Sequence, residues 1–116
     1  MNFAKLYTWV VGGLFLVAVG YTLTVELVSK GVTLEAGHKA LHVLLGIWAA
    51  VIVVRNLESQ YRLFALVNGI LWGAVATFGW TMPDFHGLDA FNRLDTILHT
   101  IVSVTGLASF ALTKKS

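Results

Sequence analysis

Long apolar segments that carry almost no charge constrain this 116-residue chain more than any other feature. Four of them lie at residues 6–28, 36–54, 63–82 and 95–112, separated by short polar connections. A helix needs about 20 mostly apolar residues to cross the hydrocarbon core of a bilayer. The pattern predicts one all-α domain, a four-helix transmembrane bundle that runs up and down. Pro83, the only proline, is expected to mark the end of the third span.

The composition agrees with membrane insertion. Hydrophobic residues make up 57% of the chain and charged residues 12%, whereas a soluble domain has about 45–50% and about 25%. A chain this short cannot bury the surplus in a water-soluble core, so we expect the lipid bilayer as its partner. With no cysteine, it has neither disulfides nor thiolate metal sites. The net charge of +2, with no basic run, gives no indication of nucleic-acid binding.

The basic residues predict an orientation in the membrane. Cytoplasmic connections are usually richer in lysine and arginine than those on the other side. One side would carry Lys5, Arg55, Arg62, Lys114 and Lys115, and the other Lys30, Lys39 and Arg93. We therefore expect a multi-pass membrane protein with both termini in the cytoplasm. All four histidines, His38, His42, His86 and His99, then belong to the outer half.

The two halves of the chain resemble each other. Gly20-Tyr21-Thr22 matches Gly79-Trp80-Thr81, and Leu41-His42 matches Leu98-His99. Chance matches between apolar helices are common, and small insertions are needed to align the rest. If the hairpins are duplicated, the second and fourth spans are equivalent.

Histidines and carboxylates line one face of the second span and one face of the fourth. Glu35, His38 and His42 are spaced i, i+3 and i+7, while Asp95 and His99 are spaced i and i+4, and each set forms a stripe on its helix. His42 and His99 should both lie about 6 Å below the outer surface. Because ionisable residues inside spans usually face the bundle interior and find partners, we expect one cluster between these two helices.

Three interpretations of the cluster remain open. In the first, the polar side chains bond one another and hold the helices in register, in a protein of structural or accessory type. In the second, His38, His42 and His99 bind a divalent metal such as zinc, copper or iron. Asp95 then serves as a fourth ligand or orients a histidine, and Glu35 precedes His38 at the spacing of carboxylate-bridged bundle sites.

The third interpretation is haem, with His42 and His99 as axial ligands and Gly46 leaving room for the porphyrin face. An enzyme is less favoured, because no set of acid, base and nucleophile is visible apart from the histidines. The motif Gly69-x-x-x-Gly73 permits close helix approach, which allows a homo-oligomer or a larger membrane complex.

Two motifs carry a family resemblance. The sequences His38-x-x-x-His42-x-x-x-Gly46 and Asn92-x-x-Asp95-x-x-Leu98-His99 resemble the paired signatures of a family of small bacterial four-span membrane proteins of unknown function. In that family the signatures begin the second and fourth spans, as here. The resemblance implies the same fold and a location in the bacterial inner (cytoplasmic) membrane, but no activity. Ser103 departs from the pattern, since such proteins often have glycine one turn after the histidine.

Overall fold

A computed structural model describes residues 2–82 and 92–113, and within those ranges the chain is helical with no strand. The first long helix contains a π-helical segment in its middle, so it is divided into three parts. The elements are α1 (Phe3–Gly13), η1 (Leu14–Val19), α2 (Gly20–Lys30), α3 (Leu34–Arg55), α4 (Glu58–Thr81) and α5 (Arg93–Leu112). The predicted all-α, four-helix fold is confirmed.

Four helices are long and apolar enough to cross a membrane: Phe3–Lys30, Glu35–Arg55, Glu58–Thr81 and Arg93–Leu112. Each extends beyond at least one end of the segment expected from hydropathy, because the polar residues that flank an apolar run continue the helix. Pro83, expected to end the third span, lies outside the described residues; the helix ends at Thr81.

The surface of the helices is strongly apolar. Val17 of η1 is 73% exposed, Val28 of α2 84% and Ile70 of α4 61%. A water-soluble monomer rarely exposes contiguous apolar area on this scale. The surplus of hydrophobic residues is therefore directed outward, where a bilayer would cover it.

Local sequence explains where the turns fall. Gly31 adopts a positive φ of 75°, which favours glycine, and ends α2. Asn56 adopts the left-handed conformation at the end of α3, with φ 48° and ψ 53°. Asparagine tolerates this conformation better than most residues. Because of these tight reversals, α3 runs antiparallel to the first helix and α4 runs antiparallel to α3.

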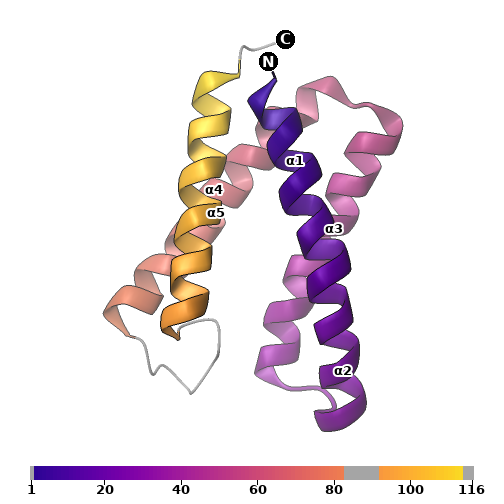
Figure 1. Ribbon diagram of the computed structural model, residues 1–116, viewed down its shortest axis with the longest axis vertical. Helices are drawn as coiled ribbons and strands as arrows, with labels where there is room; N and C mark the ends of the chain where they lie inside the picture. The colour runs from indigo at the N-terminus through magenta and orange to yellow at the C-terminus, as the bar shows by residue number, and fades with distance from the viewer. Residues whose placement is uncertain (1, 83–91, 114–116) are drawn as a thin grey trace.

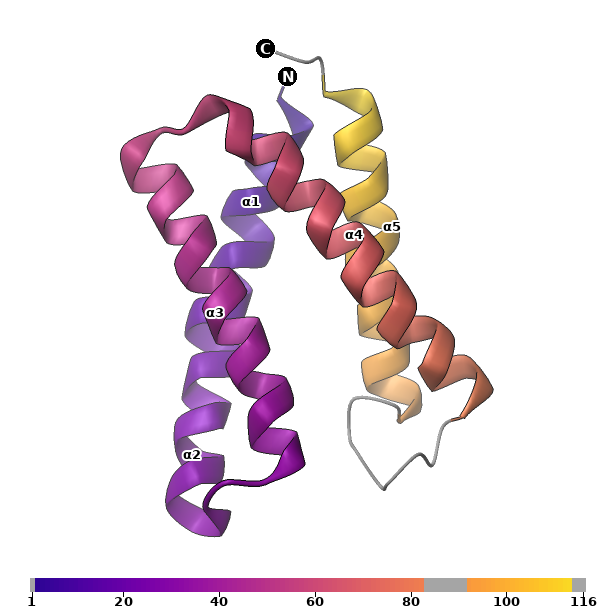
Figure 2. The ribbon, with the colours of Figure 1, turned by 180° about the vertical axis from the view of Figure 1, so that it is seen from behind.

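The helices form two hairpins that are close at one end and splayed at the other. Figures 1 and 2 show the first hairpin, α1–η1–α2 with α3, and the second, α4 with α5. The start of α1 and the end of α5 lie where the hairpins meet. The molecule is flat, with principal extents of 43 × 31 × 15 Å. It is therefore an up-down arrangement of two hairpins rather than a square bundle, and the opening lies at the end where α3 and α5 begin.

The core lies where the hairpins meet. Its largest fully buried side chains are Tyr61, Phe64 and Trp72 of α4 and Ile52 of α3. The hydroxyl of Tyr7 donates a 2.9 Å hydrogen bond to the carbonyl of Val102, which ties α1 to α5. This packing holds one end of the hairpins together and leaves the opposite end free to form a cavity.

Small residues set the crossing inside each hairpin. A Cβ on Gly46 would lie 2.8 Å from the backbone nitrogen of Leu16, so α3 and the π-helical segment touch there. In the second hairpin Ser103 contacts Gly73, and its hydroxyl donates a 2.6 Å bond to the carbonyl of Gly69. Ser103 thus permits the same close approach of α4 and α5 that a glycine at this position would allow.

The same residue offset relates Leu16 to Gly73, Gly46 to Ser103 and His42 to His99. In each hairpin the crossing therefore lies one turn beyond the histidine. A duplicated hairpin predicts this correspondence.

Candidate metal centre

Side-chain caps place the first two histidines on α3. Thr33 has an extended backbone, and its side chain accepts a 3.0 Å hydrogen bond from the backbone N–H of Ala36. This cap starts the helix at Leu34, so that Glu35 lies in the first turn, where a negative charge complements the helix dipole. His38 and His42 follow on the same face, one turn apart.

The start of α5 is built in the same way. Asn92 caps the helix by accepting a 2.8 Å hydrogen bond from the backbone N–H of Asp95, which lies in the first turn. His99 follows one turn later and is buried. Both helices thus begin at the splayed end, each with a cap, a carboxylate and then a histidine that points inward.

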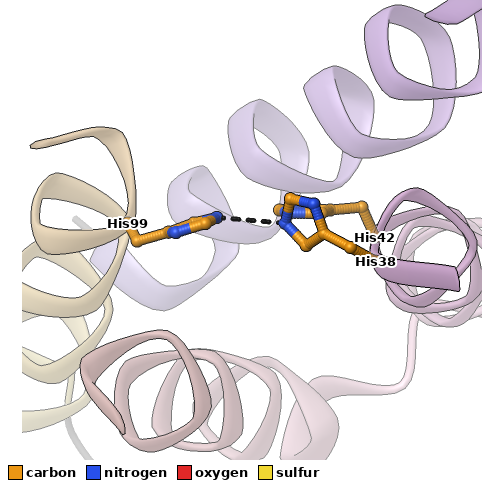
Figure 3. A group of neighbouring side chains, drawn as sticks. All are labelled: His38, His42 and His99. Carbon is orange, nitrogen blue, oxygen red and sulfur yellow. Dashed lines mark hydrogen bonds between the residues drawn. The ribbon is translucent and has the colours of Figure 1, made fainter. Parts of the chain in front are cut away.

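The three histidines meet across the gap between the hairpins. Figure 3 shows His99 reaching from α5 toward His38 and His42 on α3. The Nε2 atom of His38 lies 3.1 Å from Nε2 of His42 and 3.4 Å from Nε2 of His99. One nitrogen from each histidine lies within 4.8 Å of the other two. The predicted cluster between the second and fourth long helices therefore exists, with His38 in its middle.

Glu35 determines which nitrogen of His38 faces this point. Its Oε1 atom lies 3.0 Å from Nδ1 of His38. A carboxylate only accepts hydrogen bonds, so in the tautomer that this contact favours Nδ1 of His38 carries the hydrogen and Nε2 presents a lone pair. A carboxylate behind a histidine is the usual way in which proteins orient a metal-binding imidazole.

Hydrogen bonds alone satisfy this cluster poorly. The single lone pair on Nε2 of His38 faces two other imidazole nitrogens, and it can accept one good hydrogen bond. If His42 donates through Nε2, its Nδ1 becomes an acceptor, and this buried atom has no hydrogen-bond partner among the described residues. A cation at the shared point would instead accept the lone pairs of all three rings.

Aromatic side chains cover the histidine rings. Trp72 stacks on His42, with centroids 4.1 Å apart and planes 12° apart, and on His99, at 4.9 Å and 14°. Phe15 of the π-helical segment packs edge-on against His42 at 4.4 Å. The indole N–H of Trp72 donates a 2.9 Å hydrogen bond to Asn68, one turn earlier on α4.

Trp72 and Phe15 belong to the site, although neither is among the site residues predicted from the sequence. A signal was present in the pair Asn68 and Trp72, an indole donor and an amide acceptor at i and i+4 within a span. Such a pair fixes the ring of a buried tryptophan. The sequence does not indicate that the fixed ring would lie against histidines of other helices.

A cavity of about 420 Å³ adjoins the cluster at the splayed end. The three histidines line it together with the charged residues Glu35, Lys39 and Asp95 and with apolar side chains from η1 and α5. Lys39 is held by an ion pair with Glu26, 3.7 Å between Nζ and Oε2. The histidines are thus reached from the end of the molecule where α3 and α5 begin.

The predicted ligand residues take different positions. His38, His42 and His99 bring their nitrogens together, whereas Glu35 contacts the back of His38. Asp95 lines the cavity but does not belong to the convergent group. His86, the fourth histidine, lies outside the described residues.

The spacing fits a small ion better than a porphyrin. Metal–nitrogen bonds of 2.0–2.1 Å in tetrahedral geometry separate two ligand nitrogens by about 3.3–3.4 Å. The two distances from Nε2 of His38 are close to this value, and the three ligand nitrogens all lie within 4.8 Å of one another. A haem bound by His42 and His99 would lie between their Nε2 atoms. His38 already places its own Nε2 within hydrogen-bond distance of both.

Comparisons with known proteins add no assignment: no protein-family model, no curated protein and no solved structure matches this chain. The fold and the site define a small all-α protein with four helices suited to spanning a membrane and a buried three-histidine cluster between two hairpins.

Proposed function

We propose that this chain is a small membrane protein that binds one divalent transition-metal ion through His38, His42 and His99. The observation that supports this most strongly is the meeting of three Nε2 atoms around His38, with Glu35 fixing the hydrogen on its far nitrogen. Neutral imidazole suits zinc, copper and iron. Glu35 acts behind the ligands, and Asp95 faces the ion's cavity.

The proposed metal site also has a structural consequence. α3 and α5 belong to different hairpins and are joined at the splayed end by these side chains. An ion would link the hairpins at this end, as the apolar core links them at the other. Binding energy that is available only in the folded state adds to stability.

A metal titration of the detergent-purified chain tests the proposal. We expect one zinc ion per protein by elemental analysis, and a melting temperature that rises with zinc. At 100 times the dissociation constant the added stability is about 2.7 kcal/mol. His42→Ala and His99→Ala should lose both the ion and the rise.

Ser103→Ala is the matched control, because it removes a buried hydrogen bond between α5 and α4 without touching a ligand nitrogen. It should melt lower but still bind one ion. If the wild-type protein binds no metal and the histidine variants are merely less stable, the cluster serves only to hold the helices together. The protein would then be of structural or accessory type.

We further propose that the protein lies in a bacterial inner membrane with both termini cytoplasmic. The resemblance of its two motifs to those of small bacterial four-span proteins supports the membrane location. The lysine and arginine distribution supports this orientation. The start of α1 and the end of α5 also lie at the same end of the molecule (Figure 1), where the N–H of Ala4 donates a 2.8 Å hydrogen bond to the hydroxyl of Thr113. The metal site would then face the outside. Homo-oligomers or larger complexes in the bilayer are compatible with this arrangement, and no nucleic-acid partner is proposed.

The orientation can be tested directly because the chain has no cysteine. Ser29 and Ser59 are both exposed, near opposite ends of the helices. A membrane-impermeant maleimide should label Ser29→Cys in spheroplasts and Ser59→Cys only after lysis. The reverse pattern would place the metal site on the cytoplasmic side.

A further inference from the structure

The chain supplies three convergent ligand nitrogens, and a cavity lies beside them. The character of this cavity indicates whether the fourth ligand of a bound ion comes from the protein or from solvent. Among residues 2–82 and 92–113, the group that could hold an ion consists of His38, His42 and His99 alone. Tetrahedral zinc needs one more ligand. Structural zinc sites take the fourth ligand from the protein, whereas sites with three protein ligands and one water are open to exogenous molecules.

Two sides of the site differ in character. Trp72 is fully buried, stacks on the rings of His42 and His99, and does not line the cavity. On that side an aromatic ring excludes water. All three histidines line the cavity of about 420 Å³, which is far larger than the roughly 30 Å³ that one water occupies.

Polar groups at the cavity make it a place for water. Glu35, Lys39, Asn92 and Asp95 lie along it, at the end where α3 and α5 begin. A roomy site with several polar partners holds water, whereas an empty cavity is usually apolar. The apolar part of the lining comes from the π-helical segment, Phe15 and Val19 among others, and from Leu98 and Val102 of α5.

We propose that the ion held by the three histidines keeps one coordination position toward this cavity, filled by exchangeable water and accessible to small anions. This inference rests on the proposed metal binding. An open position is what distinguishes catalytic and transfer sites from closed structural ones. Small molecules with oxygen or nitrogen donor atoms could then enter through the cavity, bind the ion at this position, and either react there or remove the ion.

Cobalt substitution with azide as the probe tests the open position in the full chain in detergent. Tetrahedral cobalt absorbs visible light, and its spectrum changes when an exogenous ligand binds. We expect one cobalt per protein and a saturable spectral change with azide at a ratio of one to one.

Two matched tryptophan variants locate the entry. Val19 lines the cavity, whereas Val17 lies two residues away in the same segment, 73% exposed, and does not line it. Val19→Trp should weaken apparent azide affinity at least about tenfold, while Val17→Trp should stay within about twofold. Thr22→Trp, an exposed position on the cavity, serves as a second blocking variant if Val19→Trp fails to fold.

The outcomes separate the two proposals. Cobalt binding with no azide effect up to about 100 mM would mean that the protein completes the coordination, and the open position would be refuted while metal binding stands. Equal azide affinity in the cavity-lining variants and Val17→Trp would refute access through this cavity. Failure to bind cobalt or zinc would remove the proposed function, and the inference with it.

Discussion

The carboxylate behind His38 offers the sharpest test of how the site works. Glu35 contacts Nδ1 of His38 at 3.0 Å, so the proposed ion touches the imidazole and not the carboxylate. Replacing Glu35 by Gln keeps the size of the side chain and removes its charge. We expect Glu35→Gln to weaken zinc binding without changing its stoichiometry, because all three ligand nitrogens remain.

The geometry bounds the size of this effect. Adding the width of the ring and one metal–nitrogen bond to the 3.0 Å contact places the carboxylate about 7 Å from the ion. Attraction between a divalent ion and one negative charge at that distance is about 1.2 kcal/mol in water and about 5 kcal/mol at an effective dielectric constant of 20. Loss of such a carboxylate typically costs about 10- to 100-fold in metal affinity, or about 1.4–2.7 kcal/mol, which lies between these limits.

The assay is a competition titration with a zinc-sensitive dye, on wild type, Glu35→Gln and Glu26→Gln. Glu26 provides the control because it is also a carboxylate at the splayed end of the molecule, yet it pairs with Lys39 and Thr33 instead of a histidine. We expect Glu26→Gln to change zinc affinity less than about threefold, since its interactions are with groups outside the ligand set. Equal losses in both variants would mean that Glu35 acts only through bulk charge, and the orienting role would be refuted.

Three further outcomes follow from the packing and the site. Gly46→Ala should destabilise the protein by about 1–3 kcal/mol in a detergent unfolding assay, because the new Cβ would lie 2.8 Å from the backbone nitrogen of Leu16. Gly13→Ala should leave the stability unchanged, because a Cβ there would meet nothing within 4 Å. Trp72→Leu should raise the zinc dissociation constant severalfold by removing the ring that holds two ligand imidazoles, whereas Trp48→Leu, which removes a contact with Phe64, should leave it unchanged. Added haemin should give no bis-histidine absorption spectrum, since the ring centroids of His42 and His99 lie only 5.6 Å apart and Nε2 of His38 contacts Nε2 of both rings.

Much of the fold could be predicted from the sequence because it depends on local or additive properties. Apolar runs of sufficient length identify membrane-spanning helices whatever their neighbours are. Thr33 and Asn92 are good cap residues, and the helices begin beside them. The matched depth of His42 and His99 follows from counting residues along two helices, so their meeting was predictable.

The tertiary structure decided the roles within the site. Glu35 and Asp95 occupy similar first-turn positions on α3 and α5. Glu35 contacts Nδ1 of His38, and Asp95 lines the cavity beside the histidines. His38 lies one turn nearer the start of α3 than His42. Because the hairpins splay at this end, the gap between α3 and α5 is wide enough for the His38 side chain to contact both of the other histidines. Sequence spacing specifies the face of each helix, but not the angle at which two helices cross.

Trp72 is a second residue whose burial follows from the sequence but whose contacts do not. Its position within an apolar span predicts burial, and burial is what the structure shows. Its ring also lies flat on two histidines of other helices. This contact depends on the rotation of α4 relative to α3 and α5, and contacts between residues far apart in the sequence determine that rotation. The sequence by itself thus determined the helices, their caps and the depth of the histidines. Only the packing of the two hairpins decided which nitrogens meet, what lies behind them and where the cavity opens.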